Sequence, residues 1–174
     1  EIEIITIKTM TRTQKINRFS IVLVLGFLMF SCNDKTDFNQ YKSIDNEGWK
    51  ANNKVLFEFE VKDTISPKNL FINIRNNSNF EFSNLYLITE LVFPNQSKVV
   101  DTLQYEMADA SGKFLGAGFT EIKESKLFYK EKKAFPISGK YMFNVRHAMR
   151  KNGEVNPIEF LKGIQEVGFS IENY

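Results

Sequence analysis

The alternation of apolar and charged residues limits the fold of this chain more than any other feature of its sequence. In the stretch KVLFEFEVK, residues 54–62, every second side chain is apolar and falls on one face. These residues are Val55, Phe57, Phe59 and Val61. A period of two is the period of a β-strand, whereas an amphipathic helix repeats every ~3.6 residues. The stretch therefore predicts a strand with one buried face and one solvated face.

Further short strands are expected along the chain, separated by turn-forming residues such as Ser66, Pro67 and the NNSN at 76–79. They cover residues 70–75, 85–93, 99–107, 126–130, 140–149 and 167–172. No long amphipathic helix is expected, only a single helical turn opened by Pro157. Short strands at regular spacing predict an all-β fold, a single-domain antiparallel β-sandwich over residues 54–174. Strand order along the chain leaves a jelly-roll-like and an immunoglobulin-like topology open.

Two segments also indicate their places in a sheet. Residues 85–93, LYLITELVF, are apolar on both faces, which is typical of a central strand covered on both sides. Residues 126–133, KLFYKEKK, interleave lysines with Phe128 and Tyr129, a mixture that can bind nucleic acid or an anionic glycan. A solvated edge strand that lysines protect from aggregation explains the same pattern more simply.

The apolar run at residues 21–30 indicates where in the cell the protein is located rather than how it folds. It is too short to span a bilayer, which requires ~20 apolar residues in a helix. The basic residues Arg12, Lys15 and Arg18 precede it, and the small residue Ser31 follows it. A positive region, a short apolar region and a small residue at the cut are the layout of a signal peptide.

Cys32, the only cysteine, stands directly after this segment, as in a bacterial lipoprotein signal, whose cysteine becomes acylated. We predict an upstream extension at 1–9, a lipoprotein signal peptide at 10–31 and a polar tether at 32–53. The alternative for Cys32 is an inert buried thiol. Stable anchoring requires two or more acyl chains. Acylation would leave no thiol for a disulfide, a metal site or a nucleophile.

The net charge gives no sign of a nucleic-acid partner. The chain has 23 basic and 21 acidic residues. The predicted leader contains Lys8, Arg12, Lys15 and Arg18 but, as acidic residues, only Glu1 and Glu3. The remaining domain is therefore electrically balanced and lacks the basic face of a nucleic-acid-binding protein.

The sequence shows no recognisable catalytic, metal-binding or cofactor-binding motif. His147 is the only histidine, whereas a zinc site uses three or four ligands, so we expect a residue at the rim or facing a partner. The glycine-containing segment 108–125 resembles a phosphate loop only superficially, because a phenylalanine follows Gly112-Lys113. A long irregular segment of this kind can still form a binding surface.

Several longer segments carry a family resemblance that covers nearly the whole chain after Cys32. The segments DTLQYEMA, GAGFT, HAMRKNG and GIQEVGF resemble the GldH gliding-motility lipoprotein family of Bacteroidetes. The resemblance implies a lipoprotein of the cell envelope, on the outer membrane, that supports gliding in cells with a type IX secretion apparatus. It implies no enzymatic activity and no cofactor. Acylated Cys32 is the only functional residue that it transfers to this sequence.

We therefore expect a non-enzymatic scaffold, held to the membrane at Cys32, that docks other gliding or secretion proteins of the envelope. The expected partner contacts are Phe114, Phe119, His147 and Arg150. A carbohydrate-binding lipoprotein is the alternative, and Trp49, the only tryptophan, would be its stacking platform. A hydrolase is the third hypothesis, and it would require a pocket with convergent titratable groups.

Overall fold

The computed structural model describes residues 36–119 and 121–174, and every regular element in these ranges is a β-strand. The strands are β1 Thr36–Ser43, β2 Trp49–Lys50, β3 Val55–Val61, β4 Lys68–Asn76, β5 Asn84–Val92, β6 Lys98–Glu106, β7 Lys123–Lys133, β8 Gly139–His147, β9 Phe160–Leu161 and β10 Ile164–Asn173. Within the described ranges there is no helix long and apolar enough to cross a membrane.

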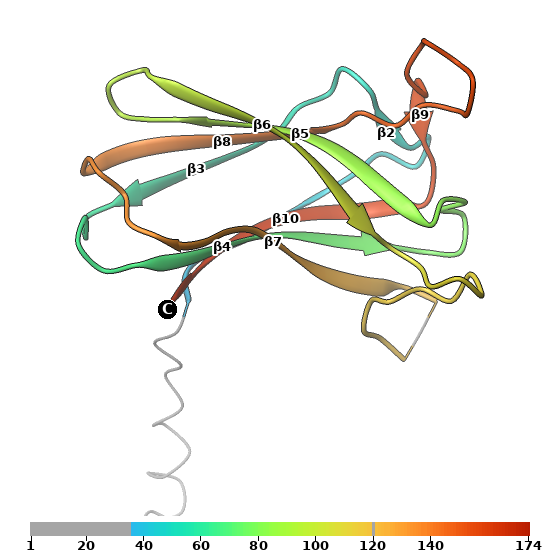
Figure 1. The fold of residues 1–174 in the computed structure, drawn as a ribbon, viewed down its shortest axis with the longest axis horizontal. Helices are drawn as coiled ribbons and strands as arrows, with labels where there is room; N and C mark the ends of the chain where they lie inside the picture. Colours follow the sequence, from blue (N-terminus) through green and yellow to red (C-terminus); the bar gives the residue numbers. More distant parts are fainter. Residues whose placement is uncertain (1–35, 120) are drawn as a thin grey trace, which may run out of the picture. The chain divides into compact units, whose positions relative to one another are not determined.

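Two antiparallel sheets of four strands form the domain and lie one above the other (Figure 1). One sheet has the order β1-β10-β4-β7 and the other the order β3-β8-β5-β6. The short strands β2 and β9 pair separately, with Trp49 opposite Leu161. The fold is a β-sandwich, as the sequence predicts.

The pairing of the strands decides between the two sandwich topologies. The pairs are nested: β5 pairs with β6, β4 with β7, β3 with β8 and β1 with β10. Nested pairs divided between two sheets in this order are the arrangement of a jelly roll, in which both sheets have four strands and the connections form Greek keys. An immunoglobulin domain instead divides its strands between sheets in the order ABED and CFG.

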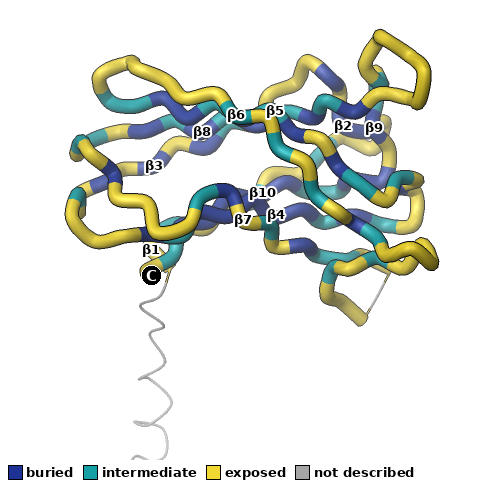
Figure 2. Tube along the Cα trace, viewed as in Figure 1, coloured by how far each residue is buried: buried dark blue, intermediate teal, exposed yellow. Residues whose placement is uncertain are grey.

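Large aromatic side chains fill the space between the sheets. Phe57, Tyr141, Phe143 and Phe169 are completely buried, and the rings of Phe143 and Phe169 stack at 4.1 Å between centroids. Figure 2 shows buried positions along the strands and exposed positions mainly on the loops. Each such ring contributes about 1.5–3 kcal/mol by leaving water, so packing supplies the stability of this domain.

The strands expected from alternation are all present, and two predicted positions are correct. β5 lies inside its sheet between β8 and β6, and β7 lies at the edge of the other sheet. The helical turn predicted at Pro157 is wrong, because Pro157 pairs with Arg150 in an isolated β-bridge.

The predicted tether differs most from the structure. Residues 36–43 of the 32–53 segment form β1, which pairs along its whole length with β10, and Trp49 is buried in the core. The polar side chains of β1 concealed its strand character, because this edge strand buries little of either face. The described domain therefore begins at Thr36, four residues after Cys32, rather than at residue 54.

The connections between strands gather at two opposite ends of the sandwich, at the left and right of Figure 1. The Thr36 end contains the start of β1, the last residues of β10 and the loops 62–67, 93–97 and 134–138. The loop end contains the segments 44–48, 77–83, 107–122, 148–159 and 162–163.

Candidate functional site

The described part of segment 107–122 at the loop end is irregular, and hydrogen bonds hold its residues 107–115. The carboxylate of Asp109 accepts hydrogen bonds from the backbone N–H groups of Ser111 and Lys113, at 2.9 and 3.0 Å. Hydrogen bonds from Ser111 and Lys113 lower the pKa of Asp109, so the carboxylate stays ionised. The N–H of Leu115 donates to the carbonyl of Met107 at 2.9 Å. Residues 107–115 therefore have a defined backbone.

Three large apolar side chains in the described part of this segment are exposed to solvent. Leu115 is 57% exposed, Ile122 is 44% exposed and the side chain of Phe119 is completely exposed, at 109%. We call these three residues the loop-end apolar residues. Exposed aromatic and aliphatic side chains on ordered loops are typical contacts for a protein partner. Sequence reasoning selected Phe119 and missed Leu115 and Ile122.

Phe114, the second expected partner contact in this segment, has a largely structural position. Its ring packs against the ring of Phe80 at 6.3 Å between centroids, and the side chain is half-buried. Arg150 is exposed, but it lies in a different connection, 148–159. Its backbone forms an isolated β-bridge with Pro157. Of the four expected contacts, Phe119 and Arg150 are therefore the ones that reach the surface fully.

His147 is completely buried, so it does not face a partner as expected. Its Nε2–H donates to the carbonyl of Trp49 at 2.8 Å, and its Nδ1 accepts from the N–H of Met149 at 3.4 Å. These two bonds use both ring nitrogens of the neutral form. Burial lowers the pKa of the His147 imidazole below its ordinary 6.5, and the charge of Arg146 acts in the same direction.

The neutral state of His147 predicts a loss of stability in weak acid. Because the folded pKa lies below the unfolded pKa, the unfolded chain binds the proton first as the pH falls. The free energy of unfolding should therefore fall as the pH drops below 6.5, until the folded pKa is reached, with a slope of at most about 1.4 kcal/mol per pH unit from this group. Urea unfolding measured between neutral and weakly acidic pH should show a flatter profile for His147→Asn. Equal slopes for the two proteins would contradict this assignment.

Trp49 is also completely buried, which removes the platform that the carbohydrate hypothesis required. The indole Nε1–H donates to the carbonyl of Asn53 at 3.0 Å, and the ring lies edge-on to His147 at 5.5 Å. Trp49 thereby fixes the β2 segment to the end of β8. An enclosed indole has no free face on which a sugar could stack.

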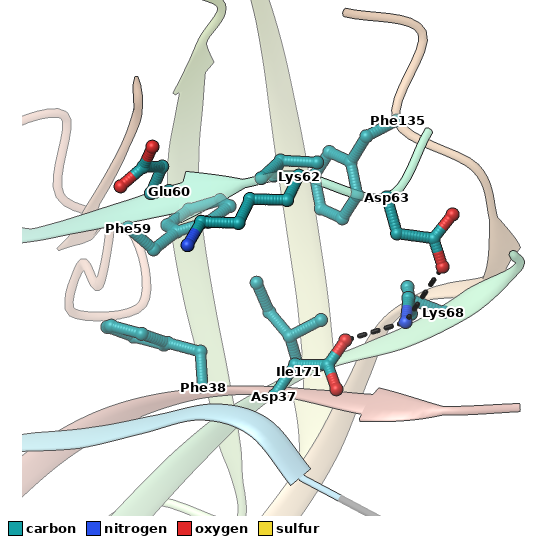
Figure 3. Close-up of a pocket in the computed structure, with 10 residues that line it drawn as sticks. Asp37, Phe38, Phe59, Glu60, Lys62, Asp63, Lys68, Phe135 and Ile171 are labelled. Atoms are coloured by element: carbon teal, nitrogen blue, oxygen red, sulfur yellow. Dashed lines mark ion pairs between the residues drawn. The ribbon is translucent and has the colours of Figure 1, made fainter. Parts of the chain in front are cut away.

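A cleft of about 330 Å³ opens between the sheets at the Thr36 end (Figure 3). Phe38, Phe59 and Phe135 form its apolar wall, and Lys68 lies at one side. The Lys68 ammonium lies 2.6 Å from Asp37 and 3.6 Å from Asp63. Because both carboxylates neutralise this nearly buried lysine, the group acts as a clamp between β1, β4 and the 62–67 loop rather than as a reactive amine.

The carboxylates of Glu124 and Glu166 also have structural partners. Glu124 accepts hydrogen bonds from Arg75 at 2.7 Å and from Tyr41 at 2.8 Å, and Arg75 also binds Glu166. Among residues 36–119 and 121–174, no three His, Cys, Asp or Glu side chains are grouped as a metal site would require. The described domain thus offers exposed loop residues as its most distinctive feature.

The fold and these loops define a jelly-roll domain with exposed apolar side chains at its loop end. The model of the family "GldH lipoprotein" matches residues 36–171. A gliding motility lipoprotein GldH homolog of Christiangramia forsetii is 45% identical over 156 residues, which cover 88% of this chain and 95% of that protein. The gliding motility lipoprotein GldH of Flavobacterium johnsoniae is 42% identical over 158 residues, 91% of this chain and 98% of that protein. The chain belongs to the GldH lipoprotein family.

Solved structures offer only a distant likeness. The infectious bursal disease virus VP2 subviral particle matches with a TM-score of 0.33 and 10% identity, over 79% of this chain and 31% of the viral chain. A likeness of this size supports no inference about fold or function.

Proposed function

We propose that this protein is a non-enzymatic scaffold of the gliding machinery, anchored to the outer membrane through acylated Cys32. Its loop end docks a neighbouring envelope protein of the gliding or type IX secretion apparatus. The observation that carries this proposal is the position of the exposed loop-end apolar residues at the end of the sandwich opposite the start of β1.

The strand lengths give the approximate distance between the two ends of the sandwich. β4 has nine residues, which span about 30 Å at ~3.3 Å per residue. Thr36 lies four residues after Cys32, and four residue spacings reach at most about 14 Å. A lipid anchor at Cys32 would therefore hold the Thr36 end near the membrane and present the loop end roughly 30 Å farther out. The names of the relatives support a place in gliding, and no enzyme name occurs among them.

The docking role predicts that charged residues at the loop end abolish gliding without unfolding the domain. In a Leu115→Asp, Phe119→Asp double variant, two exposed apolar contacts would become carboxylates that the partner interface cannot solvate. Truncating a binding hot spot costs about 2 kcal/mol or more, roughly a 30-fold loss of affinity. We expect colonies with this variant to stop spreading while the protein keeps its abundance and unfolding midpoint.

The matched control is Val100→Asp, which places a carboxylate near the start of β6, away from the loop end. Val100 is 56% exposed, close to the exposure of Leu115. This variant should spread normally. Normal spreading of the double variant, in cells that contain wild-type amounts of it, would rule out docking through segment 107–122.

A further inference from the structure

We propose that the Thr36 end of the sandwich rests directly on the phospholipid headgroups of the anchoring membrane, with Ile65 as the apolar contact and Lys132 and Lys133 as cationic contacts. This placement depends on the proposed acylation of Cys32. The protein surface at the Thr36 end would contact the membrane in addition to the acyl chains. The membrane would then fix the orientation of the domain as well as hold it.

Ile65 is exposed in a loop with a fixed conformation. It is 87% exposed, although it belongs to the 62–67 connection between the two sheets. The carboxylate of Asp63 accepts hydrogen bonds from the N–H groups of Ile65 and Ser66, at 2.9 and 3.0 Å. A hydrogen bond from the Ser66 side chain, together with these two backbone bonds, holds the pKa of Asp63 well below its ordinary range, so the turn persists in acid. An isoleucine held out into solvent by an ordered turn is available for burial in a lipid surface.

Cationic and aromatic side chains stand beside this loop. The N–H of Tyr174 donates to the carbonyl of Pro67 at 3.3 Å, and the Lys132 ammonium lies over the Tyr174 ring at 4.2 Å. Lys133 lies opposite Lys68, the first residue after the loop, in the pairing of β7 with β4. Lysine and tyrosine favour the membrane interface, where the ammonium reaches the phosphates and the rest of the side chain lies among less polar groups.

The length of chain before β1 limits what can cover this surface. Thr36 pairs with Glu172, and Glu172 pairs in turn with Asn69, so the starts of β1 and β4 are two strand spacings, about 10 Å, apart. With Cys32 at the membrane, the gap below Thr36 is at most about 14 Å. A folded domain of 100 residues has a radius of gyration of about 13 Å and does not fit in such a gap. Lipid headgroups are therefore the occupant that the geometry favours.

The test uses the protein as purified from the membranes of its own cells, in vesicles of phosphatidylethanolamine and phosphatidylglycerol. Because acylation consumes the only native thiol, Ile65→Cys provides a single site for an environment-sensitive fluorophore. Val155→Cys, at a position 81% exposed in the loop end, is the control. We expect a nitroxide-labelled lipid to quench the label at 65 at least about twice as strongly as the label at 155. Iodide in the buffer should show the opposite preference.

Each alternative result has a separate meaning. Protein that does not float with the vesicles would overturn both the acylation of Cys32 and the contact. Protein that floats, with equal iodide quenching at 65 and 155, would overturn the contact and leave the anchor intact. Protection of the label at 65 from both quenchers would show that a second copy of the chain covers this end, which would also overturn the lipid contact.

Charge variants test the lysines independently. Lys132→Glu with Lys133→Glu should reduce lipid quenching of the label at 65, since each lysine near an anionic surface contributes roughly five-fold in affinity. Lys151→Glu with Lys162→Glu makes the same change in net charge at exposed positions of the loop end and should leave the quenching unchanged. The difference should disappear in vesicles without phosphatidylglycerol. Equal quenching for the two double variants would overturn the role of Lys132 and Lys133.

Discussion

Replacing Cys32 by Ala is expected to shift the protein from nearly complete membrane retention to nearly complete solubility and to abolish colony spreading. Each buried CH₂ of an acyl chain contributes about 0.8 kcal/mol to membrane binding, and stable anchoring takes two chains or more. The jelly-roll domain, which begins four residues later, should fold as before. Fractionation of cells, followed by mass spectrometry of the purified product, measures both the location and the modification.

Ser31→Gly is the matched control for this change. It keeps a small residue at the predicted cleavage position, so acylation, retention and spreading should remain. Two results would contradict the anchoring hypothesis. One is full spreading in cells that contain only the soluble Ala form, and the other is an unmodified Cys32 thiol in the native product.

Replacing Gly163 by Ala is expected to destabilise the domain by about 3 kcal/mol or more, which is a large fraction of a typical total. Gly163 has a φ of +86°, a left-handed conformation that costs other residues roughly 1–2 kcal/mol. A Cβ at this position would also lie 2.0 Å from the backbone nitrogen of Phe80, so the neighbouring turn would have to move. Urea unfolding of the variant should show a markedly lower midpoint.

Gly153→Ala separates the two causes. Gly153 has a similar φ of +82°, but a Cβ there would meet no atom within 4 Å. It should therefore cost only the roughly 1–2 kcal/mol of the left-handed conformation. Equal losses of stability for the two variants would show that the close approach to Phe80 contributes nothing.

Most strands that alternation predicted bury one face in the core, whereas β6 is predicted correctly although it buries no complete face. β3 is the clearest case of a buried face, because Val55, Phe57, Phe59 and Val61 all lie in the core. β1 escaped prediction for the opposite reason: it is an edge strand with mostly exposed side chains, held by its backbone hydrogen bonds to β10. Hydrogen bonding to a distant strand leaves no periodic pattern in the local sequence.

The candidate site was predicted only where local sequence determines exposure. A phenylalanine among glycines and polar residues, such as Phe119, has no strand to bury it, and the structure places it in solvent. His147 and Trp49 were misplaced because their burial depends on each other. They lie 98 residues apart, and the hydrogen bond between them exists only after β2 packs against the end of β8.

The sequence by itself determined the all-β class, most strands and the family, because side-chain alternation and long ordered motifs are local properties. Only the tertiary structure decided the jelly-roll order, the pairing of residues 36–43 with β10 and the opposition of the two ends of the sandwich. The physical reason is that strand pairing joins segments far apart in the chain. The partner of each strand is chosen by the packing of the whole core, which no single segment encodes.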